Sequence, residues 1–163
     1  MTGGMRIVPM TPAYAREIAS WHYDPPYDCY DVTDAAYVAE PGNGFFALAD
    51  ATGLIGFRSF GPDGQVPGGN YDGSALDTGG GLRPDLTGRG LGREAISTGL
   101  DFGRQRFAPE AFRVTIATFN IRARRVVEAL GFRHVDSFKA LADGRSFEIL
   151  VRQEPVSRCG PGE

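Results

Sequence analysis

Three glycines alternate along the segment from Leu82 to Arg93, and their spacing is the clearest indication of chemistry in the sequence. The segment reads Leu-Arg-Pro-Asp-Leu-Thr-Gly-Arg-Gly-Leu-Gly-Arg and joins a strand-like run to a long helical pattern. Backbone without side chains can wrap around an anion with successive N–H groups directed inward, and a helix N-terminus adds about half a positive charge. Arg89 and Arg93 would add full positive charges. The spacing therefore predicts a site for a phosphate ester or a diphosphate.

Two common phosphate-binding patterns do not match this segment. A P-loop requires a Lys after its glycines, and here Arg93 follows Gly92. A dinucleotide-binding fold requires G-x-G-x-x-G after the first strand of a βαβ unit, whereas this segment has G-x-G-x-G in the middle of the chain. A glycine-rich turn that precedes a helix and binds nothing is the structural alternative.

The length and composition are those of one globular domain. The chain has 163 residues, of which 42% are hydrophobic and 23% are charged, within the usual range for a domain with a single core. We therefore expect one domain over residues 1–157 and a frayed tail over residues 158–163. No apolar run approaches the length of about 18 residues that a membrane span requires, and residues 1–10 lack the apolar stretch of a secretory signal. These features predict a cytoplasmic protein without a membrane partner.

The balance of charge argues against nucleic acid as a partner. The formal net charge is −3, and neutralising a phosphate backbone requires a basic face. The cysteines, Cys29 and Cys159, and the histidines, His22 and His134, are isolated in the sequence. They have no spacing typical of a zinc site or a disulfide framework. We therefore expect no metal, and we expect both histidines to be packed or exposed residues without a catalytic role.

Hydrophobic spacing and turn residues predict a mixed sheet with helices on its faces. Thr11 and Pro12 are typical of a helix start, and Asn120 is a natural N-cap for a later helix. The run Gly79–Gly81 indicates a bulge or a close backbone approach at the end of a strand. The expected strands are 6–10, 45–50, 54–60, 74–82, 112–118, 132–140 and 146–153; one helix begins at 12 and ends before 25, and others cover 33–39, 90–107 and 121–130. This order predicts an α/β or α+β fold.

Two segments resemble the signatures of one enzyme family, the Gcn5-related N-acetyltransferases (GNAT). The segment from Leu82 to Gly92 is similar to the family's acetyl-CoA signature, [QR]-x-x-G-x-[GA]. The segment that begins at Asn120, Asn-Ile-Arg-Ala-Arg-Arg-Val-Val-Glu-Ala-Leu-Gly-Phe, is similar to its second signature, Asn-x-x-Ala followed by Gly-Phe before the next strand. The resemblance extends from Arg6 to Gln153. It implies a GNAT-like mixed, mostly antiparallel sheet of about seven strands with helices on both faces.

Two positions depart from the family pattern. The Gln or Arg that opens the first signature falls on Thr87, so one phosphate ligand is altered, and Arg89 or Arg93 would have to compensate. The Tyr that the family often places near the end of the second helix, where it protonates the leaving thiolate, falls on Val127. The usual general acid is therefore missing, and water or Tyr71 is the expected substitute.

The resemblance also implies how acetyl-CoA would bind as a co-substrate. The strand that ends at Leu82 and the strand 112–118 would splay apart, and the pantetheine arm would pair with main-chain groups of Gly80 and Leu82. Asn120 would reach the pantetheine or the thioester, or would only cap its helix, and Arg124 or Arg125 would meet the 3′-phosphate. The implied cofactor-binding residues, with the loop N–H groups at the diphosphate, are Gly80, Leu82, Thr87, Gly88, Arg89, Gly90, Leu91, Gly92, Arg93, Asn120 and Arg125.

The reaction that the family implies is direct attack of a neutral amine on the acetyl thioester. Because an amine with a pKa of about 10 is mostly protonated at pH 7, a general base would help. Asp77, on the strand that leads to the glycine run, is the candidate catalytic residue. The acceptor is expected between segment 21–32 and loop 61–73, whose aromatic and acidic residues suit a cationic amine. The candidate substrate-binding residues are Tyr27, Asp28, Tyr30 and Tyr71.

Three functions are compatible with the sequence. The first is an acetyl-CoA-dependent N-acetyltransferase that acts on a small amine or a peptide amine. The second, favoured by Val127, is a non-catalytic acyl-CoA-binding sensor or interaction domain. The third is a nucleotide-binding domain, which would respond to ATP or NAD rather than to coenzyme A. Dimers are common in the resembled family, so a homodimer is an expectation by analogy alone.

Overall fold

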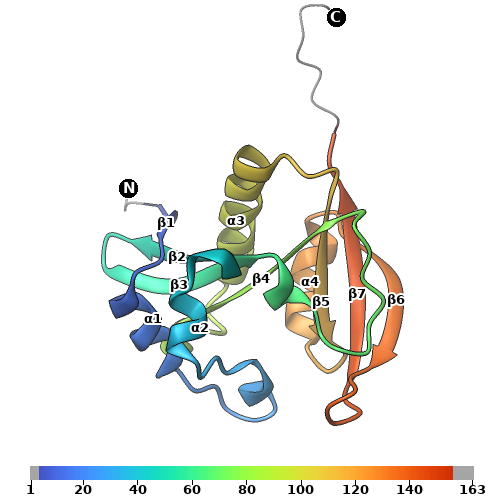
Figure 1. The fold of residues 1–163 in the computed structure, drawn as a ribbon, viewed down its shortest axis with the longest axis horizontal. Helices are drawn as coiled ribbons and strands as arrows, with labels where there is room; N and C mark the ends of the chain where they lie inside the picture. Colours follow the sequence, from blue (N-terminus) through green and yellow to red (C-terminus); the bar gives the residue numbers. More distant parts are fainter. Residues whose placement is uncertain (1–3, 156–163) are drawn as a thin grey trace, which may run out of the picture.

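One seven-stranded sheet organises the protein (Figure 1). The computed structural model describes residues 4–155, and the strand order is β1-β2-β3-β4-β5-β7-β6. Neighbouring strands run antiparallel except β4 and β5, which are parallel. The strands are β1 (Arg6–Pro9), β2 (Phe45–Asp50), β3 (Gly53–Phe60), β4 (Leu76–Leu82), β5 (Ala111–Ala117), β6 (Arg133–Lys139) and β7 (Ser146–Gln153). The expected mixed, mostly antiparallel sheet is thus confirmed, whereas the tail expected at 158–163 lies outside the described residues.

Helices pack against both faces of this sheet (Figure 1). Ile18 of α1 packs with Phe57 of β3, while Leu100 of α3 and Val127 of α4 pack with Phe60 of the same strand. Strand residues three positions apart point to opposite faces, so the two helix pairs bury separate cores. The helices are α1 (Pro12–Ala19), α2 (Ala35–Ala39), α3 (Gly92–Phe107) and α4 (Ile121–Ala129), with 3₁₀ turns η1 (Tyr27–Tyr30), η2 (Pro41–Asn43), η3 (Pro62–Gly64) and η4 (Pro84–Leu86). Within residues 4–155, no helix has the length and hydropathy needed to cross a membrane.

Side-chain caps determine where three of these helices begin. The side chains of Thr11 and Asp34 accept hydrogen bonds from N–H groups in the first turns of α1 and α2. Asn120 caps α4 in the same way, as the sequence predicted. Helix α3 differs, because its N-cap is Leu91, which has no side-chain oxygen. The first N–H groups of α3 are therefore left for another acceptor.

β4 and β5 separate soon after they meet, and this separation creates the space for a site (Figure 1). In the described chain their parallel pairing comprises two residue pairs, Leu76 with Phe112 and Asp77 with Arg113. Beyond them, β4 stays paired with β3 to its end, and β5 stays paired with β7. The facing edges of the two strands are therefore unpaired beyond residues 77 and 113. The expectation that these two strands splay apart is confirmed.

A buried ion pair joins the two strands at the last paired register. Arg113 donates from Nε to Oδ1 of Asp77 at 2.6 Å and from Nη2 to Oδ2 at 2.8 Å. Each of the two side chains is 5% exposed. Gln65 donates from Nε2 to Oδ2 of Asp77 at 2.9 Å. Hydrogen bonding to Asp77 raises the pKa of Arg113 above its ordinary value. This bidentate pair therefore fixes the point from which β4 and β5 diverge.

Replacing Asp77 is expected to destabilise the fold, because Arg113 would be left as a buried charge without its main partner. For Asp77→Ala we predict a loss of about 3–5 kcal/mol in the free energy of unfolding, measured by urea titration. The matched control is Asp101→Ala, which breaks an exposed pair with Arg104 and should cost less than about 1 kcal/mol. Equal losses for the two variants would contradict a structural role for the Asp77 pair.

Candidate functional site

A cleft of about 830 Å³ opens where β4 and β5 diverge. This volume lies within the range of small-molecule sites in proteins. The walls of the cleft come from the glycine segment 87–93, from β4 and β5, and from the first turns of α3 and α4. Segment 22–32 and loop 63–66 complete the lining. Segments that lie far apart in the sequence therefore meet around one cleft.

The glycine loop brings the N-terminus of α3 to one end of this cleft. Gly88 and Gly90 have left-handed φ values of +75° and +80°, a conformation that glycine adopts at low cost. The conformation of Gly90 also explains why α3 begins at Gly92 rather than at residue 90 as expected. These three glycines and Thr87 line the cleft. Main-chain N–H groups and the positive end of an uncapped helix dipole therefore border the cleft here.

Two guanidinium groups border the glycine loop, and sequence reasoning missed one of them. Arg93 lines the cleft from the first turn of α3. Arg122 lines it from the first turn of α4, with its Cζ 5.1 Å from the ring centroid of Tyr27. A Cβ built on Gly88 would lie 3.4 Å from Nη1 of Arg122. From the same helix, the resemblance had implied only Arg124 or Arg125, at the 3′-phosphate; the signal for Arg122 is its place in the first helical turn, two residues after the cap.

Several residues expected at the site lie outside the cleft lining. Arg89 and Arg125 are exposed, and neither they nor Leu91 belong to the lining. At Arg89 and Leu91, only the main-chain N–H groups are left as ligands for an anion on the loop. Asp28 is exposed outside the cleft. Tyr71 does not line the cleft either; its hydroxyl is 2.8 Å from the hydroxyl of Thr115, which does line it.

Asn120 connects the cap of α4 to a tyrosine in the cleft. Its Oδ1 accepts from the N–H of Ala123 at 3.1 Å, which directs Nδ2 toward the Tyr30 hydroxyl at 3.2 Å. The N–H of Ala117 donates to the same hydroxyl oxygen at 3.1 Å. A tyrosine hydroxyl has two lone pairs and one proton, and no described residue accepts the proton of Tyr30. Burial raises the pKa of Tyr30 above its ordinary value. Tyr30 therefore carries a proton that is available to a group in the cleft.

Main-chain alternation directs Gly80 and Leu82 toward the gap between the strands. The N–H of Arg83 donates to a carbonyl of β3 at 2.8 Å, and successive strand residues direct their main-chain groups to opposite edges. The groups of Gly80 and Leu82 therefore face β5. The Tyr23 hydroxyl donates to the Leu82 carbonyl at 2.7 Å. Burial and, to a lesser extent, Asp31 raise the pKa of Tyr23 to about 12, so this donor stays protonated at neutral pH.

The placement of Asp77 requires a correction to its expected role as general base. Both of its carboxylate oxygens are engaged by Arg113, and Asp77 does not line the cleft. Because its oxygens are occupied and its side chain lies outside the cleft lining, Asp77 is not placed to take a proton from an amine in the cleft. The sequence does not show which strand residue lies beside Asp77.

The cleft contains other proton acceptors that sequence reasoning missed. His22 and Asp31 both line it, with Nδ1 of His22 3.1 Å from Oδ2 of Asp31. The N–H of Tyr23 donates to the other Asp31 oxygen at 2.9 Å, which fixes the carboxylate. Asp63 also lines the cleft. Much of the surface of Asp63 is exposed, but the surrounding protein partly desolvates its carboxyl group, and this desolvation raises the pKa of Asp63.

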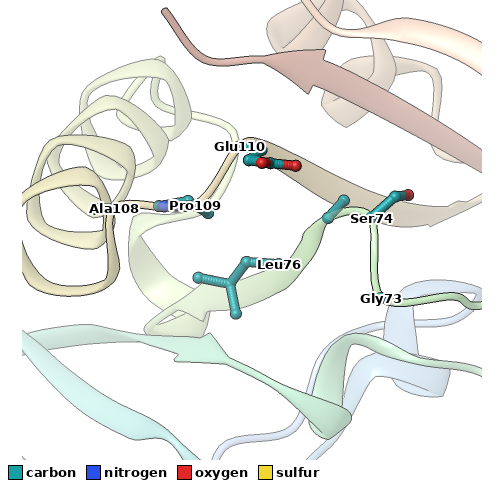
Figure 2. Close-up of a pocket in the computed structure, with 7 residues that line it drawn as sticks. Gly73, Ser74, Leu76, Ala108, Pro109 and Glu110 are labelled. Atoms are coloured by element: carbon teal, nitrogen blue, oxygen red, sulfur yellow. The ribbon is translucent and has the colours of Figure 1, made fainter. Parts of the chain in front are cut away.

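A second, smaller hollow of about 380 Å³ lies at the paired end of β4 and β5 (Figure 2). Figure 2 shows Ser74 and Leu76 on one side and Ala108, Pro109 and Glu110 on the other. Its lining includes one carboxylate and no other ionisable side chain. It is separate from the glycine loop, and we assign no function to it.

Most of this chain matches one known protein family. A profile of the acetyltransferase (GNAT) domain matches residues 5–133. Because the match covers most of the chain, the protein belongs to the GNAT acetyltransferase family. A search of curated protein sequences found no significant match.

Solved structures of GNAT acetyltransferases share the fold. A GNAT acetyltransferase from Bacillus anthracis aligns with a TM-score of 0.71 at 15% identity, covering 94% of this chain and 96% of the other. A mutant form of the spermidine N-acetyltransferase SpeG from Vibrio cholerae aligns with a TM-score of 0.68 at 14% identity, covering 91% and 93%. A putative GNAT-family acetyltransferase from Bordetella pertussis aligns with a TM-score of 0.67 at 21% identity, covering 90% and 93%. At these identities the likeness concerns the fold.

The glycine loop is expected to be the part of the cleft on which coenzyme A binding depends most. Gly90→Asp would add a negative charge and a strained φ where a diphosphate would bind, so we predict that coenzyme A will raise the melting temperature of the natural protein but not of this variant. The matched control is Gly53→Asp, because Gly53 also has a positive φ and open space around its Cβ position but is the first residue of β3, away from the cleft lining. A normal response of Gly90→Asp to coenzyme A would contradict the assignment.

Proposed function

We propose that this protein transfers the acetyl group of acetyl-CoA to a primary amine of a small molecule or peptide, by direct attack. The observation that carries this proposal is the continuity of one cleft, from the glycine loop through the β4–β5 gap to the aromatic and acidic segment 22–32. A donor can enter at one end and an acceptor at the other. We also propose that residues 1–157 form one domain around this cleft.

The loop end of the cleft suits the diphosphate of coenzyme A. The N–H groups of residues 88–92 would donate hydrogen bonds to the diphosphate, and the uncapped start of α3 would stabilise its negative charge. Arg93 and Arg122 supply guanidinium groups at this end of the cleft. Thr87 stands where the family pattern has Gln or Arg, and its hydroxyl donates to the Pro84 carbonyl at 2.8 Å. Thr87 therefore contributes its backbone rather than a charge.

The gap between β4 and β5 suits the pantetheine arm. The main-chain groups of Gly80 and the N–H of Leu82 face the gap, as does the unpaired edge of β5. The amides of pantetheine would satisfy these groups in the manner of an additional strand. Asn120 already uses both ends of its amide within the protein. It is therefore a positioning residue for Tyr30 rather than a direct ligand.

The other end of the cleft suits a cationic amine. Asp24, Asp31 and Asp63 line this end together with Tyr27, and carboxylates and aromatic faces attract ammonium groups. The SpeG protein from Vibrio cholerae, which shares the fold, acts on spermidine, a polyamine. We therefore propose a small cationic amine as the acceptor, with Asp63 drawing its positive charge into the cleft.

The attacking amine must lose a proton, and we propose His22 as the group that takes it. An imidazole changes charge near neutral pH, and Asp31 holds Nδ1 of His22, which leaves Nε2 free as the acceptor. The amine nitrogen then forms a bond to the carbonyl carbon as the C–S bond breaks. Tyr30 supplies its unpartnered proton to the thiolate, at which point the products are an amide and the thiol of coenzyme A.

The His22 role predicts a loss of turnover. His22→Gln removes the nitrogen that would accept the amine proton, so kcat should fall about 10²–10⁴-fold, with little change in the KM for acetyl-CoA. The check is steady-state kinetics on both proteins. An unchanged kcat in His22→Gln would show that another group accepts the proton.

The Tyr30 role predicts a loss of turnover without a loss of donor binding. Tyr30→Phe removes the proton donor, and the expected fall in kcat is about 10²–10⁴-fold, with little change in the KM for acetyl-CoA. Tyr37→Phe is the matched control, because Tyr37 is 40% exposed on α2 and outside the cleft. Steady-state kinetics distinguish the two variants, and equal kcat values for both would contradict the acid role.

A non-catalytic acyl-CoA sensor is the second candidate function. Val127, at the usual place of the acid, is 2% exposed in an apolar core and cannot donate a proton. The two functions differ in turnover. Incubation with acetyl-CoA and a panel of polyamines, monoamines and peptide N-termini, with detection of free thiol, should show release with a cationic amine. Donor binding without thiol release from any amine would favour the sensor.

A further inference from the structure

Arg58 is a buried cation that no acid in the described chain neutralises. It lies on β3, is 6% exposed, and lines the cleft. Within residues 4–155, no carboxylate oxygen lies within 4 Å of its nitrogens, and its Nε has no hydrogen-bond partner. The other buried arginine of the sheet, Arg113, has a bidentate carboxylate partner. Arg58 is therefore the exception among the buried charges.

Two glycines form a slot for this side chain. A Cβ on Gly80 of β4 would lie 2.6 Å from Nη1 of Arg58 and 2.9 Å from its Cδ. A Cβ on Gly99 of α3 would lie 2.8 Å from Nε and 3.2 Å from Cγ. Any larger residue at either position would displace the arginine. The side chain therefore passes between β4 and α3 in a space that only these two glycines leave open.

The slot places the guanidinium on the opposite side of β4 from the acceptor segment. A Cβ on Gly81 would lie 2.9 Å from the Tyr23 hydroxyl, whereas Gly80 faces Arg58. Consecutive strand residues point to opposite faces, so Tyr23 and Arg58 lie on the two sides of the strand. Ala95 and Ile96 of α3 line the cleft on the Arg58 side. Arg58 therefore lies on the α3 side of β4, where the cleft lining includes the apolar residues Ala95 and Ile96.

A buried charge without a partner is costly, which indicates that Arg58 has a use. Burial lowers the pKa of Arg58 to about 10, yet the group still carries its charge at neutral pH. Because the cleft is the side from which an anion can reach it, the missing partner is a ligand group. The diphosphate is already matched by the glycine loop at the first turn of α3, whereas Gly99, which Nε of Arg58 approaches, lies seven residues further along that helix, about 10 Å from Gly92. The partner of Arg58 must therefore belong to the acyl end of the donor.

We propose that Arg58 binds the carboxylate of a short dicarboxylic acyl group, such as malonyl or succinyl, carried as its coenzyme A thioester. This inference rests on the proposed function, because only a donor bound in the β4–β5 gap, which Gly80 borders, would bring its acyl group near Arg58. The amine nitrogen forms a bond to the thioester carbonyl carbon, the C–S bond breaks, and the thiolate takes a proton. The product is an amide with a free distal carboxylate. Acetyl transfer is retained as an activity with the smaller donor.

The first test compares donors on the natural protein. Succinyl-CoA and butyryl-CoA have acyl chains of equal carbon count, but only the succinyl chain ends in a carboxylate. We expect kcat/KM for succinyl-CoA to exceed that for butyryl-CoA by at least about 30-fold, the low end of the effect of an unpaired buried charge. A butyryl-CoA value equal to or above the succinyl-CoA value would overturn the proposal. This comparison needs no variant and is therefore independent of folding.

The second test removes the charge. Arg58→Met should reduce the succinyl-to-butyryl ratio to about one, and Arg58→Lys should retain part of the preference. Arg133→Met, which removes a guanidinium from the exposed strand β6, is the control and should retain the full ratio. Equal losses for both donors in Arg58→Met would overturn the proposal. Failure of coenzyme A itself to raise the melting temperature of the natural protein would instead reject the proposed function on which it rests.

Discussion

The Asp77–Arg113 ion pair determines where the sheet opens. It lies at the final register of the only parallel strand pair in the described residues, and both side chains are shielded from water. Beyond it, β4 follows β3 and β5 follows β7, so two strand edges face each other without hydrogen bonding. Unsatisfied main-chain groups are costly inside a protein. A ligand with its own amides would relieve that cost, which is why an opening of this shape favours pantetheine over a purely apolar ligand.

Because the glycine run in β4 has no side chains, only backbone separates the groups that pack on the two faces of this strand. On one side, the Tyr23 hydroxyl approaches Gly81, and on the other the Arg58 side chain passes Gly80. A donor that lies along the edge of β4 would thus have the acceptor end of the cleft on one side and the buried cation on the other. On the proposed function, the same glycines would therefore also separate the choice of amine from the choice of acyl group.

The sequence allowed most of the fold to be predicted, together with the glycine loop that borders the cleft. Strand and helix patterns, the Asn120 cap and the glycine spacing are local signals, and the structure follows them closely. The predictions that the geometry does not support concern residues whose surroundings depend on neighbours across the sheet. Asp77 faces Arg113, which is 36 residues away, and no local pattern shows that contact.

The His22–Asp31 pair and the unpaired charge of Arg58 could not be predicted from local sequence patterns, for the same reason. The His22–Asp31 pair forms because segment 22–32 folds back on itself around η1. Arg58 appears in the sequence as one arginine within an apolar strand. Its isolation becomes visible only when β4 and α3 are placed around it. Sequence patterns therefore predict elements well and predict their mutual contacts poorly.

The decisive measurement is a crystal structure of the complex with coenzyme A. We expect diphosphate oxygens within hydrogen-bond distance of the N–H groups of residues 88–92. We also expect pantetheine amides paired with the main chain of Gly80 and Leu82. Coenzyme A bound elsewhere on the protein, or a β4–β5 gap that stays filled by protein side chains at saturating ligand, would contradict this expectation.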